Sequence, residues 1–439
     1  MADFPGLAEE AGWDDEQMAV TNWAGNVTFT PQEVLVPRTL DEARAMVAEA
    51  HRIRALGTGH SFNPIADSAV LISMHAVDLP FQLDENARTV IVPGAAAYGA
   101  VAGFLQEHGW ALHNLGSLPQ ISVAGAVATG THGSGDGNGT LATAVRGIER
   151  IGPDGDLSWV REGEPGFEGS VVALGALGIT TRLELAIEPT YDITQHIYTG
   201  LSWDRFLEAF DEIMGSAHSV SVLGRWSEPC LSTLWLKCRD DDASPDAHRF
   251  GAALQAPRVG ALSDGGAPDD NLTPIGTRGS WVTRLAHFRF DRAPSAGGDE
   301  LQSEYFVPRD QAVDALRAVR ALADRIDPLL HVSEFRTIAG DHLWLSGGEG
   351  GPRLGIHFTW RKRPDDVARV LPDIEAALAP FSPRAHWGKL YSNIFDHTMA
   401  YRRLPDFLDL VERTDPAGTF RSPHLDHVLG LTHRSGLPT

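Results

Sequence analysis

The sequence predicts an α+β protein of two domains. At 439 residues, the chain is longer than one hydrophobic core usually supports. Its first half alternates helical segments with short strand-like ones, whereas its second half combines amphipathic helices with strands suited to an antiparallel sheet. A glycine-rich stretch at residues 116–139, with neither helical nor strand periodicity, indicates a region of tight turns and close backbone approach.

In the first half, the clearest predicted elements are two helices. The first begins after Thr39, because Thr39 and Glu42 fit a capping box and apolar residues recur beyond them at helical spacing. The second covers about residues 96–108 and stops at Gly109. Short strands are expected at residues 54–59, 70–74, 89–92 and 183–187.

The second half is predicted to be an antiparallel sheet covered by helices. Amphipathic helices are expected around residues 203–213 and 309–325, where apolar side chains share one face. Between them, residues 239–279 are rich in Asp, Gly and Pro and are expected to form surface excursions or a mobile loop. Strands are expected at residues 281–290, 355–360 and 387–391. The predicted domains are residues 20–190, residues 191–405, and residues 406–439 as a C-terminal return to the first domain.

Composition excludes several classes of function. Acidic residues outnumber basic ones by 58 to 36, which disfavours binding to nucleic acids and anionic membranes. The two cysteines, Cys230 and Cys238, have no neighbours at metal-ligand spacing, and Asp240–Asp242 is interpreted as a solvated turn, so no metal site is expected. Residues 1–16 lack the features of a signal peptide, and no segment is suited to span a bilayer. The expectation is a cytoplasmic monomer.

One short loop offers a candidate cofactor site. Two glycines directly before a histidine let the backbone bend sharply and direct N–H groups at a diphosphate. An ordinary glycine turn with an exposed histidine would have the same pattern, and no G-x-G-x-x-G opens a helix here. Further glycine-rich segments at residues 116–139 and 175–178 favour the cofactor interpretation. The loop consists of Gly57, Thr58, Gly59, His60 and Ser61.

Together, these glycine segments resemble the vanillyl-alcohol oxidase family of FAD enzymes, and within it the alditol oxidase branch. The resemblance runs from about residue 23 to the end of the chain. Its later motifs are Glu300-Leu301-Gln302-Ser303-Glu304-Tyr305-Phe306, Ser333-Glu334-Phe335-Arg336, His357-Phe358-Thr359-Trp360 and His386-Trp387-Gly388-Lys389. The last motif is also similar to the His-Trp-x-Lys of sugar-lactone oxidases. The resemblance implies a PCMH-type FAD-binding domain followed by a substrate domain.

For the cofactor, the resemblance implies FAD bonded covalently to His60. A second, cysteine linkage is not expected, because residues 116–139 contain no cysteine. The resemblance places Gly116 beside the flavin, where a small residue leaves room for O2, although a glycine there could equally serve the turn. His132 is assigned to the flavin, with a hydrogen bond from its ring to the backbone as the alternative. The implied cofactor residues are Gly57, Thr58, Gly59, His60, Ser61, Gly116, Ser117, Ser122, Gly125, Gly130, Thr131, His132, Gly133, Gly178 and Ile179.

The substrate site is predicted on neighbouring strands. Glu334 and Arg336 are two apart, which puts both side chains on one face of a strand, and His357 and Thr359 repeat that spacing. A weak surface salt bridge between Glu334 and Arg336 is the alternative. The residues that the resemblance implies contact substrate are Ser117, Glu334, Arg336, His357, Thr359 and Lys389.

The reaction that the resemblance implies is oxidation of the terminal primary hydroxyl of alditols such as xylitol and sorbitol. Hydride passes to flavin N5, and O2 is reduced to hydrogen peroxide. Arg336 and Lys389 would stabilise developing negative charge, His357 is the candidate base, and Glu334 would help to orient the substrate hydroxyls, with Thr359 and Ser117. The alternatives are a sugar-1,4-lactone oxidase or dehydrogenase of the same superfamily, and a polyol-binding protein without catalysis.

Overall fold

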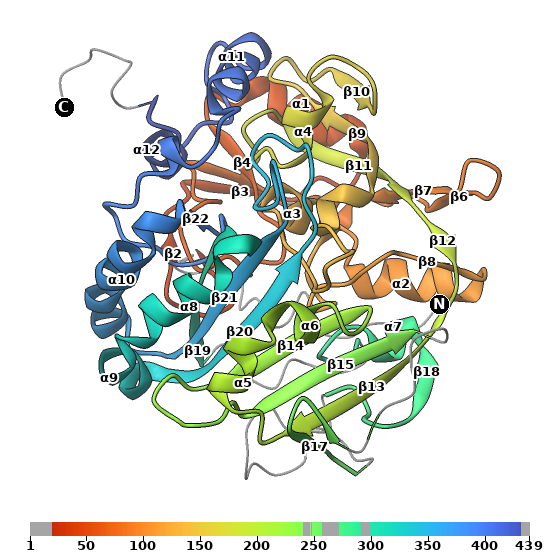
Figure 1. The fold of residues 1–439 in the computed structure, drawn as a ribbon. Helices are drawn as coiled ribbons and strands as arrows, with labels where there is room; N and C mark the ends of the chain where they lie inside the picture. The colour runs from red at the N-terminus through yellow and green to blue at the C-terminus, as the bar shows by residue number, and fades with distance from the viewer. Residues whose placement is uncertain (1–19, 240–245, 247, 257–271, 291–298, 432–439) are drawn as a thin grey trace.

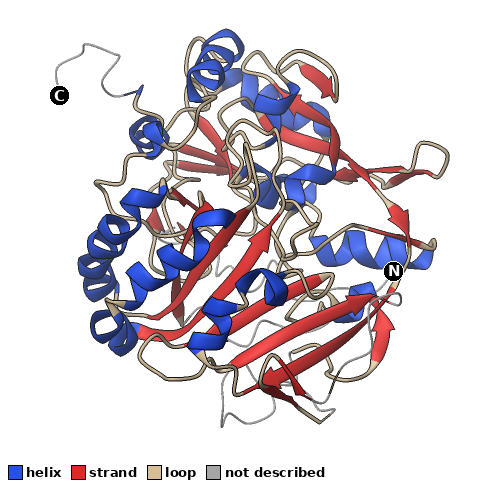
Figure 2. Cartoon of the chain, in the orientation of Figure 1, coloured by secondary structure: helices blue, strands red, loops and turns tan. Residues whose placement is uncertain are grey.

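The computed structural model describes residues 20–239, 246, 248–256, 272–290 and 299–431. Helices and strands are interspersed along the chain, and the predicted α+β class is confirmed (Figures 1 and 2). Residues 1–16 and the solvated turn expected at Asp240–Asp242 lie outside the described residues. Within the described ranges, no helix combines the length and the apolar character that a membrane crossing would require.

The first half contains a five-stranded antiparallel sheet and a three-stranded parallel one. The antiparallel sheet has the order β10-β9-β11-β7-β6, with β6 at Gln82–Asp84, β7 at Thr89–Pro93, β9 at Val145–Ile151, β10 at Leu157–Arg161 and β11 at Ile179–Ala186. The parallel sheet has the order β3-β5-β4, with β3 at Glu33–Leu35, β5 at Val70–Ile72 and β4 at Ile53–Ala55. Two short pairs are β1 (Val20–Thr21) with β2 (Thr28–Phe29) and β8 (Trp110–Ala111) with β12 (Glu188–Pro189).

Both helices predicted in this half are present. Helix α1 spans Leu40–Glu49, and the capping box is confirmed because the Thr39 hydroxyl accepts a hydrogen bond from the backbone N–H of Glu42 at 3.2 Å. Helix α2 spans Tyr98–Glu107 and is followed by Gly109, whose φ of 78° takes the chain out of the helix. The shorter helices α3 (Val123–Ala128) and α4 (Phe167–Val171) complete this half.

The second half is built on a ten-stranded antiparallel sheet, which occupies the lower part of Figure 1. Its order is β16-β17-β13-β15-β14-β20-β21-β19-β22, with β18 paired to β13. The strands are β13 (Asp192–Thr199), β14 (Ser219–Gly224), β15 (Thr233–Arg239), β16 (His248–Arg249), β17 (Ala252–Leu254), β18 (Arg278–Ser280), β19 (Glu300–Pro308), β20 (Leu330–Ile338), β21 (Arg353–Arg361) and β22 (Arg384–Ala385).

Helices cover one face of this sheet, and strand alternation decides which side chains meet them. Leu301, Tyr305 and Val307 of β19 are buried in the core shared with the helices, whereas Gln302 and Glu304 project from the opposite face. Strands β20 and β21 alternate in the same way. The covering helices are α5 (Trp203–Glu208), α6 (Phe210–Met214), α8 (Ala312–Arg320), α9 (Ala323–Ile326) and α10 (Pro364–Leu378).

Two predicted strands are wrong. Residues 281–290 begin as helix α7 (Trp281–Arg284), and the buried Lys237 ammonium donates to the carbonyl oxygens of Arg284, Leu285 and Ala286, which therefore do not pair in a sheet. Residues 387–391 form a turn after β22. The helix predicted at residues 203–213 is divided at Ala209 into α5 and α6.

The C-terminal part of the chain packs against the first half. Helices α11 (Leu404–Thr414) and α12 (Pro423–Val428) bury Phe407 and Leu425 in the core that also contains Leu185 of β11. In Figure 1 helix α11 lies at the top of the view and α12 at the upper left, on the side of the first half. We therefore keep the three predicted domain ranges as a proposal, since the two sheets divide the chain near the same positions.

Arg54 connects this C-terminal segment to the first half, and its removal is expected to destabilise the fold. Its buried guanidinium donates to the carbonyl oxygens of Phe420 at 2.6 Å and Leu174 at 2.5 Å. Arg54→Met would leave both buried acceptors without a donor, at a cost of roughly 3 kcal/mol in the free energy of unfolding. Urea denaturation should show this loss, while the exposed Arg38→Met serves as the control. Equal stability of the two variants would contradict the assigned role.

Candidate active site

A cavity of about 740 Å³ is lined by residues from both halves of the molecule. This volume lies within the range of cofactor and ligand pockets in proteins. One wall is formed by the loop at residues 57–62, residues 117–132 and the segment 174–180, and the facing wall by the polar side of β19, β20 and β21. The cavity therefore brings the predicted cofactor loop and the predicted substrate strands together.

Backbone contacts explain why the first loop requires its glycines. A side chain at Gly57 would approach the Ser122 hydroxyl to 2.7 Å, and Gly59 has a φ of +68°, a conformation that other residues rarely adopt. The N–H of Trp23 donates to the Gly59 carbonyl oxygen at 2.8 Å. The indole of Trp23 stacks on the ring of His60 with 5.3 Å between ring centroids and an angle of 20°. The histidine ring is thereby held in one orientation at the cavity wall.

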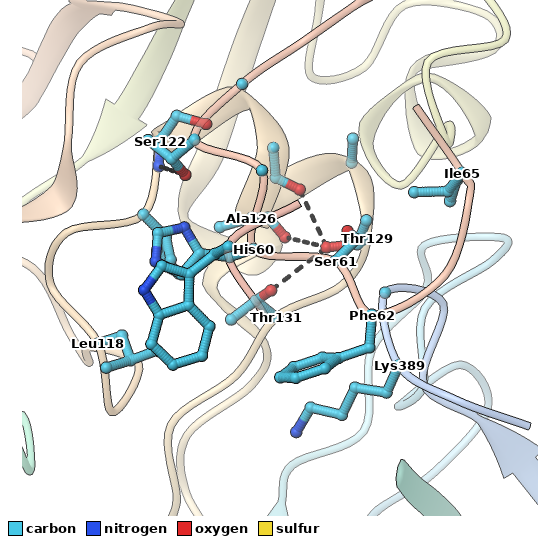
Figure 3. Close-up of a pocket in the computed structure, with 18 of the residues that line it drawn as sticks. His60, Ser61, Phe62, Ile65, Leu118, Ser122, Ala126, Thr129, Thr131 and Lys389 are labelled. Atoms are coloured by element: carbon cyan, nitrogen blue, oxygen red, sulfur yellow. Dashed lines mark hydrogen bonds between the residues drawn. The ribbon is translucent and has the colours of Figure 1, made fainter. Parts of the chain in front are cut away.

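His60 has the properties of a neutral, nucleophilic imidazole. Burial lowers its pKa to about 4, and the adjoining backbone of Thr58 offsets only part of that effect. Its Nδ1 atom is buried and has no hydrogen-bond partner among the described residues. Figure 3 shows His60 beside Ser122 and Leu118, with Lys389 in the same cavity. A ring nitrogen without a partner at this wall fits a bond to a flavin.

Most of the predicted cofactor residues do line this cavity. They come from three loops whose backbone is bent by glycines, as the sequence indicates. His132 lines the cavity, and its Nδ1 also lies 2.8 Å from the Gly133 carbonyl oxygen, so both interpretations offered for it have support. The predicted cofactor residues in the cavity wall are Gly57, Thr58, Gly59, His60, Ser61, Ser117, Ser122, Gly125, Thr131, His132 and Gly178.

Four predicted cofactor residues are not in the cavity wall, and packing or backbone conformation accounts for three of them. Ile179 is buried in a separate hydrophobic core. Gly133 allows close packing, since a Cβ there would lie 2.4 Å from the Leu115 carbonyl oxygen. Gly130 has a φ of +66° at the turn that follows α3. A Cβ at Gly116 would make an ordinary contact of 3.6 Å with the Thr131 side chain, so the link of Gly116 to O2 remains a prediction.

All six predicted substrate residues line the cavity, and strand register explains how they meet. Residue His357 of β21 lies opposite Glu334 of β20 in the sheet, and Val332 lies opposite Thr359. Arg336 donates to the Ser117 hydroxyl at 3.1 Å, which joins the sheet to the glycine-rich segment. The Arg336 and Glu334 side chains approach to 3.5 Å and both are buried, so they are not the surface pair considered as the alternative.

The residue at the centre of the site, Glu304, was not predicted. Its carboxylate is 0% exposed and lies opposite His357 in the β19–β21 register. It accepts from Lys389 Nζ at 2.5 Å and from Arg336 Nη2 at 3.4 Å, and His132 Nε2 lies 3.0 Å from it. The sequence did contain a signal for it. In the motif at residues 300–306, Gln302 and Glu304 alternate with Leu301, Ser303 and Tyr305, which places both polar side chains on one face of a strand.

Glu304 and Glu334 are both held as anions by neighbouring basic groups. Burial opposes the ionisation of Glu304, but Lys389, His132 and Arg336 outweigh it and lower its pKa well below the ordinary value. Burial likewise opposes ionisation of Glu334, and Arg336 and His287 reverse the effect on its pKa. His287 Nε2 lies 2.8 Å from the Glu334 carboxylate. His287 was missed because the sequence predicted a continuous strand there.

The turn that carries Lys389 is fixed by the cofactor loop. The Asn63 amide donates to the carbonyl oxygens of Trp387 and Lys389, each at 2.8 Å, and the N–H of Phe62 donates to the Gly388 carbonyl oxygen at 2.8 Å. On the other side, the N–H of Leu390 donates to the backbone of β19. The structure thus positions this lysine by a turn between the two halves, where the sequence had predicted a strand.

One group of side chains has the spacing of a metal site. Ligand atoms of His132, Glu304 and His386 all lie within 4.8 Å of one another. The Glu304 carboxylate is already paired with the cations of Lys389 and Arg336, which would repel a metal ion at the same position. We therefore do not propose a metal here.

Comparison with known proteins agrees with this geometry. The profile of the family described as FAD binding domain matches residues 31–161, and that of D-arabinono-1,4-lactone oxidase matches residues 299–428. An alditol oxidase from a Streptomyces species is 43% identical over 417 residues, which cover 94% of this chain and 99% of that protein. An L-gulono-1,4-lactone dehydrogenase from Mycobacterium tuberculosis is 25% identical over 93% of this chain and 99% of its own length.

Among solved structures, the cholesterol oxidase from B. sterolicum shares the fold. It superimposes with a TM-score of 0.75 at 13% identity, covering 93% of this chain and 96% of that one. This likeness confirms the PCMH-type fold of the first half and the sheet of the second. By its identity with the Streptomyces relative over nearly the full length of both proteins, the chain belongs to the alditol oxidase family of vanillyl-alcohol oxidase-type, FAD-dependent oxidoreductases that act on CH–OH donors.

Proposed function

We propose that this protein oxidises the terminal primary hydroxyl of an alditol to the corresponding aldose, with O2 as the electron acceptor and hydrogen peroxide as a product. The observation that carries the proposal is the single cavity in which the His60 loop faces a buried row of hydrogen-bonding side chains on β19, β20 and β21. The 43% identity with an alditol oxidase supports this choice over the more distant lactone-oxidising relatives.

A polyol suits this cavity because each of its hydroxyl groups both donates and accepts hydrogen bonds. Leaving one such group unpaired on burial would cost about 1–3 kcal/mol, so a polyol site needs many polar partners. Arg336 and Lys389 are donors, the Glu334 carboxylate is an acceptor, and the hydroxyls of Ser117 and Thr359 can act as either. These five side chains would orient the substrate.

Bound FAD would supply the acceptor for the hydride that leaves the carbinol carbon and would return the electrons to O2. The chain itself would stabilise the negative charge that develops on the substrate oxygen, since Arg336 and Lys389 are cations in the cavity wall. His357 is the base that the sequence led us to expect, and its pKa of about 4, lowered by burial and by Lys389, keeps the ring neutral. The Nε2 atom of that ring lies 3.1 Å from the Thr359 hydroxyl.

We also propose that FAD is attached by a single covalent bond to His60. The neutral ring, the Nδ1 atom without a partner and the stacking of Trp23 support attachment at this residue. No cysteine occurs in residues 116–139 to form a second bond. The finer expectations of a monomer and of a cytoplasmic location remain proposals that rest on composition.

The substrate class can be tested by following hydrogen peroxide formation with xylitol, sorbitol and L-gulono-1,4-lactone in parallel. Peroxide formation with the two alditols is expected, because their terminal CH2OH groups carry the reacting hydroxyl. Activity with the lactone alone would overturn the proposal in favour of a lactone oxidase. Tightly bound flavin that none of the three compounds reduces would instead favour a protein that binds polyols without oxidising them.

Lys389→Met is expected to slow reduction of the bound flavin by alditol on the order of 10²–10³-fold, because a cation that stabilises the developing oxyanion is lost. The rate is measured by anaerobic stopped-flow absorbance. The exposed Lys362→Met is the matched control and should react at the wild-type rate. A rate near that of the wild type in Lys389→Met would remove this lysine from the mechanism.

His60→Ala is expected to abolish covalent flavin attachment. After acid precipitation, flavin fluorescence should stay with the wild-type polypeptide and move to the supernatant for the variant. His51→Ala, which removes an exposed histidine, should behave as the wild type does. Release of all flavin from the precipitated wild-type protein would refute covalent attachment altogether.

A further inference from the structure

The Glu304–Lys389 pair is the shortest of the four contacts that the Glu304 carboxylate makes with its basic neighbours. Lys389 Nζ lies 2.5 Å from Glu304 Oε2, whereas Arg336 lies 3.4 Å from the other oxygen. Glu304 is fully buried and the Lys389 side chain is only 12% exposed, so water screens their interaction little. Because an opposite charge at this distance favours the charged form of each group, Glu304 favours the ammonium form of Lys389.

Lys389 in turn determines which nitrogen of His357 carries a proton. Lys389 Nζ lies 2.7 Å from His357 Nδ1, and the ammonium form has only donors to offer. Nδ1 lies nearer to this donor than to the Glu304 carboxylate, which is 3.4 Å away, so Nδ1 accepts from Lys389 and the ring proton is on Nε2, 3.1 Å from the Thr359 hydroxyl. This tautomer is assigned from the hydrogen-bond network. In it, the Nε2 atom of His357 donates and cannot take a proton.

We propose that Glu304 is a positioning residue that keeps Lys389 protonated and directed into the cavity and, through Lys389, fixes the donating tautomer of His357. The part of this proposal that concerns the reaction rests on the proposed alditol oxidation. Glu304 itself acts through its neighbours and has no assigned contact with the substrate. The proposal changes His357 from the expected base into a hydrogen-bond donor.

Other charged groups also face Lys389, and they come from every element packed against it. Burial lowers the pKa of Lys389, and Glu304 is the group that opposes this shift most strongly. Arg336 lowers the pKa of Lys389 further and Glu334 raises it. The remaining neighbours whose charge interacts with Lys389 are His132, Glu300, His357 and His386. Among them, Glu300 is a second carboxylate on β19 and provides a matched control.

The sequence offers a direct measurement, because its three lysines are Lys237, Lys362 and Lys389. Flavin-loaded protein labelled with ¹³C at the lysine Cε position gives one NMR signal per lysine, and the signal that Lys389→Arg lacks belongs to Lys389. The pH midpoint of that signal reports the protonation of Lys389. In Glu304→Gln it should move to lower pH than in the wild type, because the stabilising negative charge is gone.

Two variants separate the charge of Glu304 from its packing. Glu304→Asp keeps the charge on a shorter side chain, so its midpoint should lie between those of the wild type and Glu304→Gln. Glu300→Gln removes a nearby charge that makes no ion pair with Lys389 and should leave the midpoint close to the wild-type value. An unchanged midpoint in Glu304→Gln, or an equal shift in Glu300→Gln, would overturn the proposal. If Glu304→Gln does not fold, an unshifted midpoint in Glu304→Asp would overturn the proposal.

Kinetics provide the second readout. If protonated Lys389 is the active form, flavin reduction is fast below the pKa of Lys389 and is lost as pH rises through it. Glu304→Gln should therefore move the alkaline limb of the rate profile to lower pH, whereas a loss of packing alone would lower the rate at every pH without moving the limb. Should neither alditols nor lactones reduce the wild-type flavin, the proposed function fails, and the NMR midpoints still decide the role of Glu304.

Discussion

The site depends on the neutralisation of one buried carboxylate. Glu304 has no exposed surface, and an unpaired anion there would be strongly unfavourable. Lys389 and Arg336, which lie on different elements, supply the compensating charge. The positions of both cations are thus tied to a single strand residue. The surrounding hydrogen bonds then follow, since Arg336 reaches Ser117 and Lys389 reaches His357.

The same cluster links the two halves of the molecule. The turn that carries Lys389 is attached to the cofactor loop through the Asn63 amide and to β19 through backbone hydrogen bonds. A cofactor held by His60 and a substrate held by the sheet would therefore meet at a lysine fixed from both sides. A shift of the sheet relative to the first half would disturb this lysine, so contacts such as those of Arg54 support the site as well as the fold.

Sequence patterns predicted the features that depend on residues close together in the chain. They missed the features that depend on contacts between distant segments. The Thr39 capping box was predictable because it needs only residues three apart, and the shared face of Glu334 and Arg336 follows from strand alternation. The α7 helix could not be predicted in this way. The carbonyl oxygens at and just after its end accept from Lys237, which lies more than forty positions earlier in the chain. Glu304 was overlooked since its importance comes from four partners on four different segments.

Charge balance in the cluster around Glu304 favours an uncharged ligand at this part of the cavity. In this cluster Glu304 and Glu334 are anions and Arg336 and Lys389 are cations, and burial lowers the pKa of His132, His287 and His357 and keeps these rings neutral, so the charges of the cluster cancel. A polyol would leave that balance unchanged, because its hydroxyl groups are uncharged and can donate to the carboxylates and accept from the cations. A sugar acid would add a buried negative charge that no remaining cation of this cluster neutralises. The arrangement that holds Lys389 in place thus also favours a neutral alcohol as the substrate and a neutral aldose as the product.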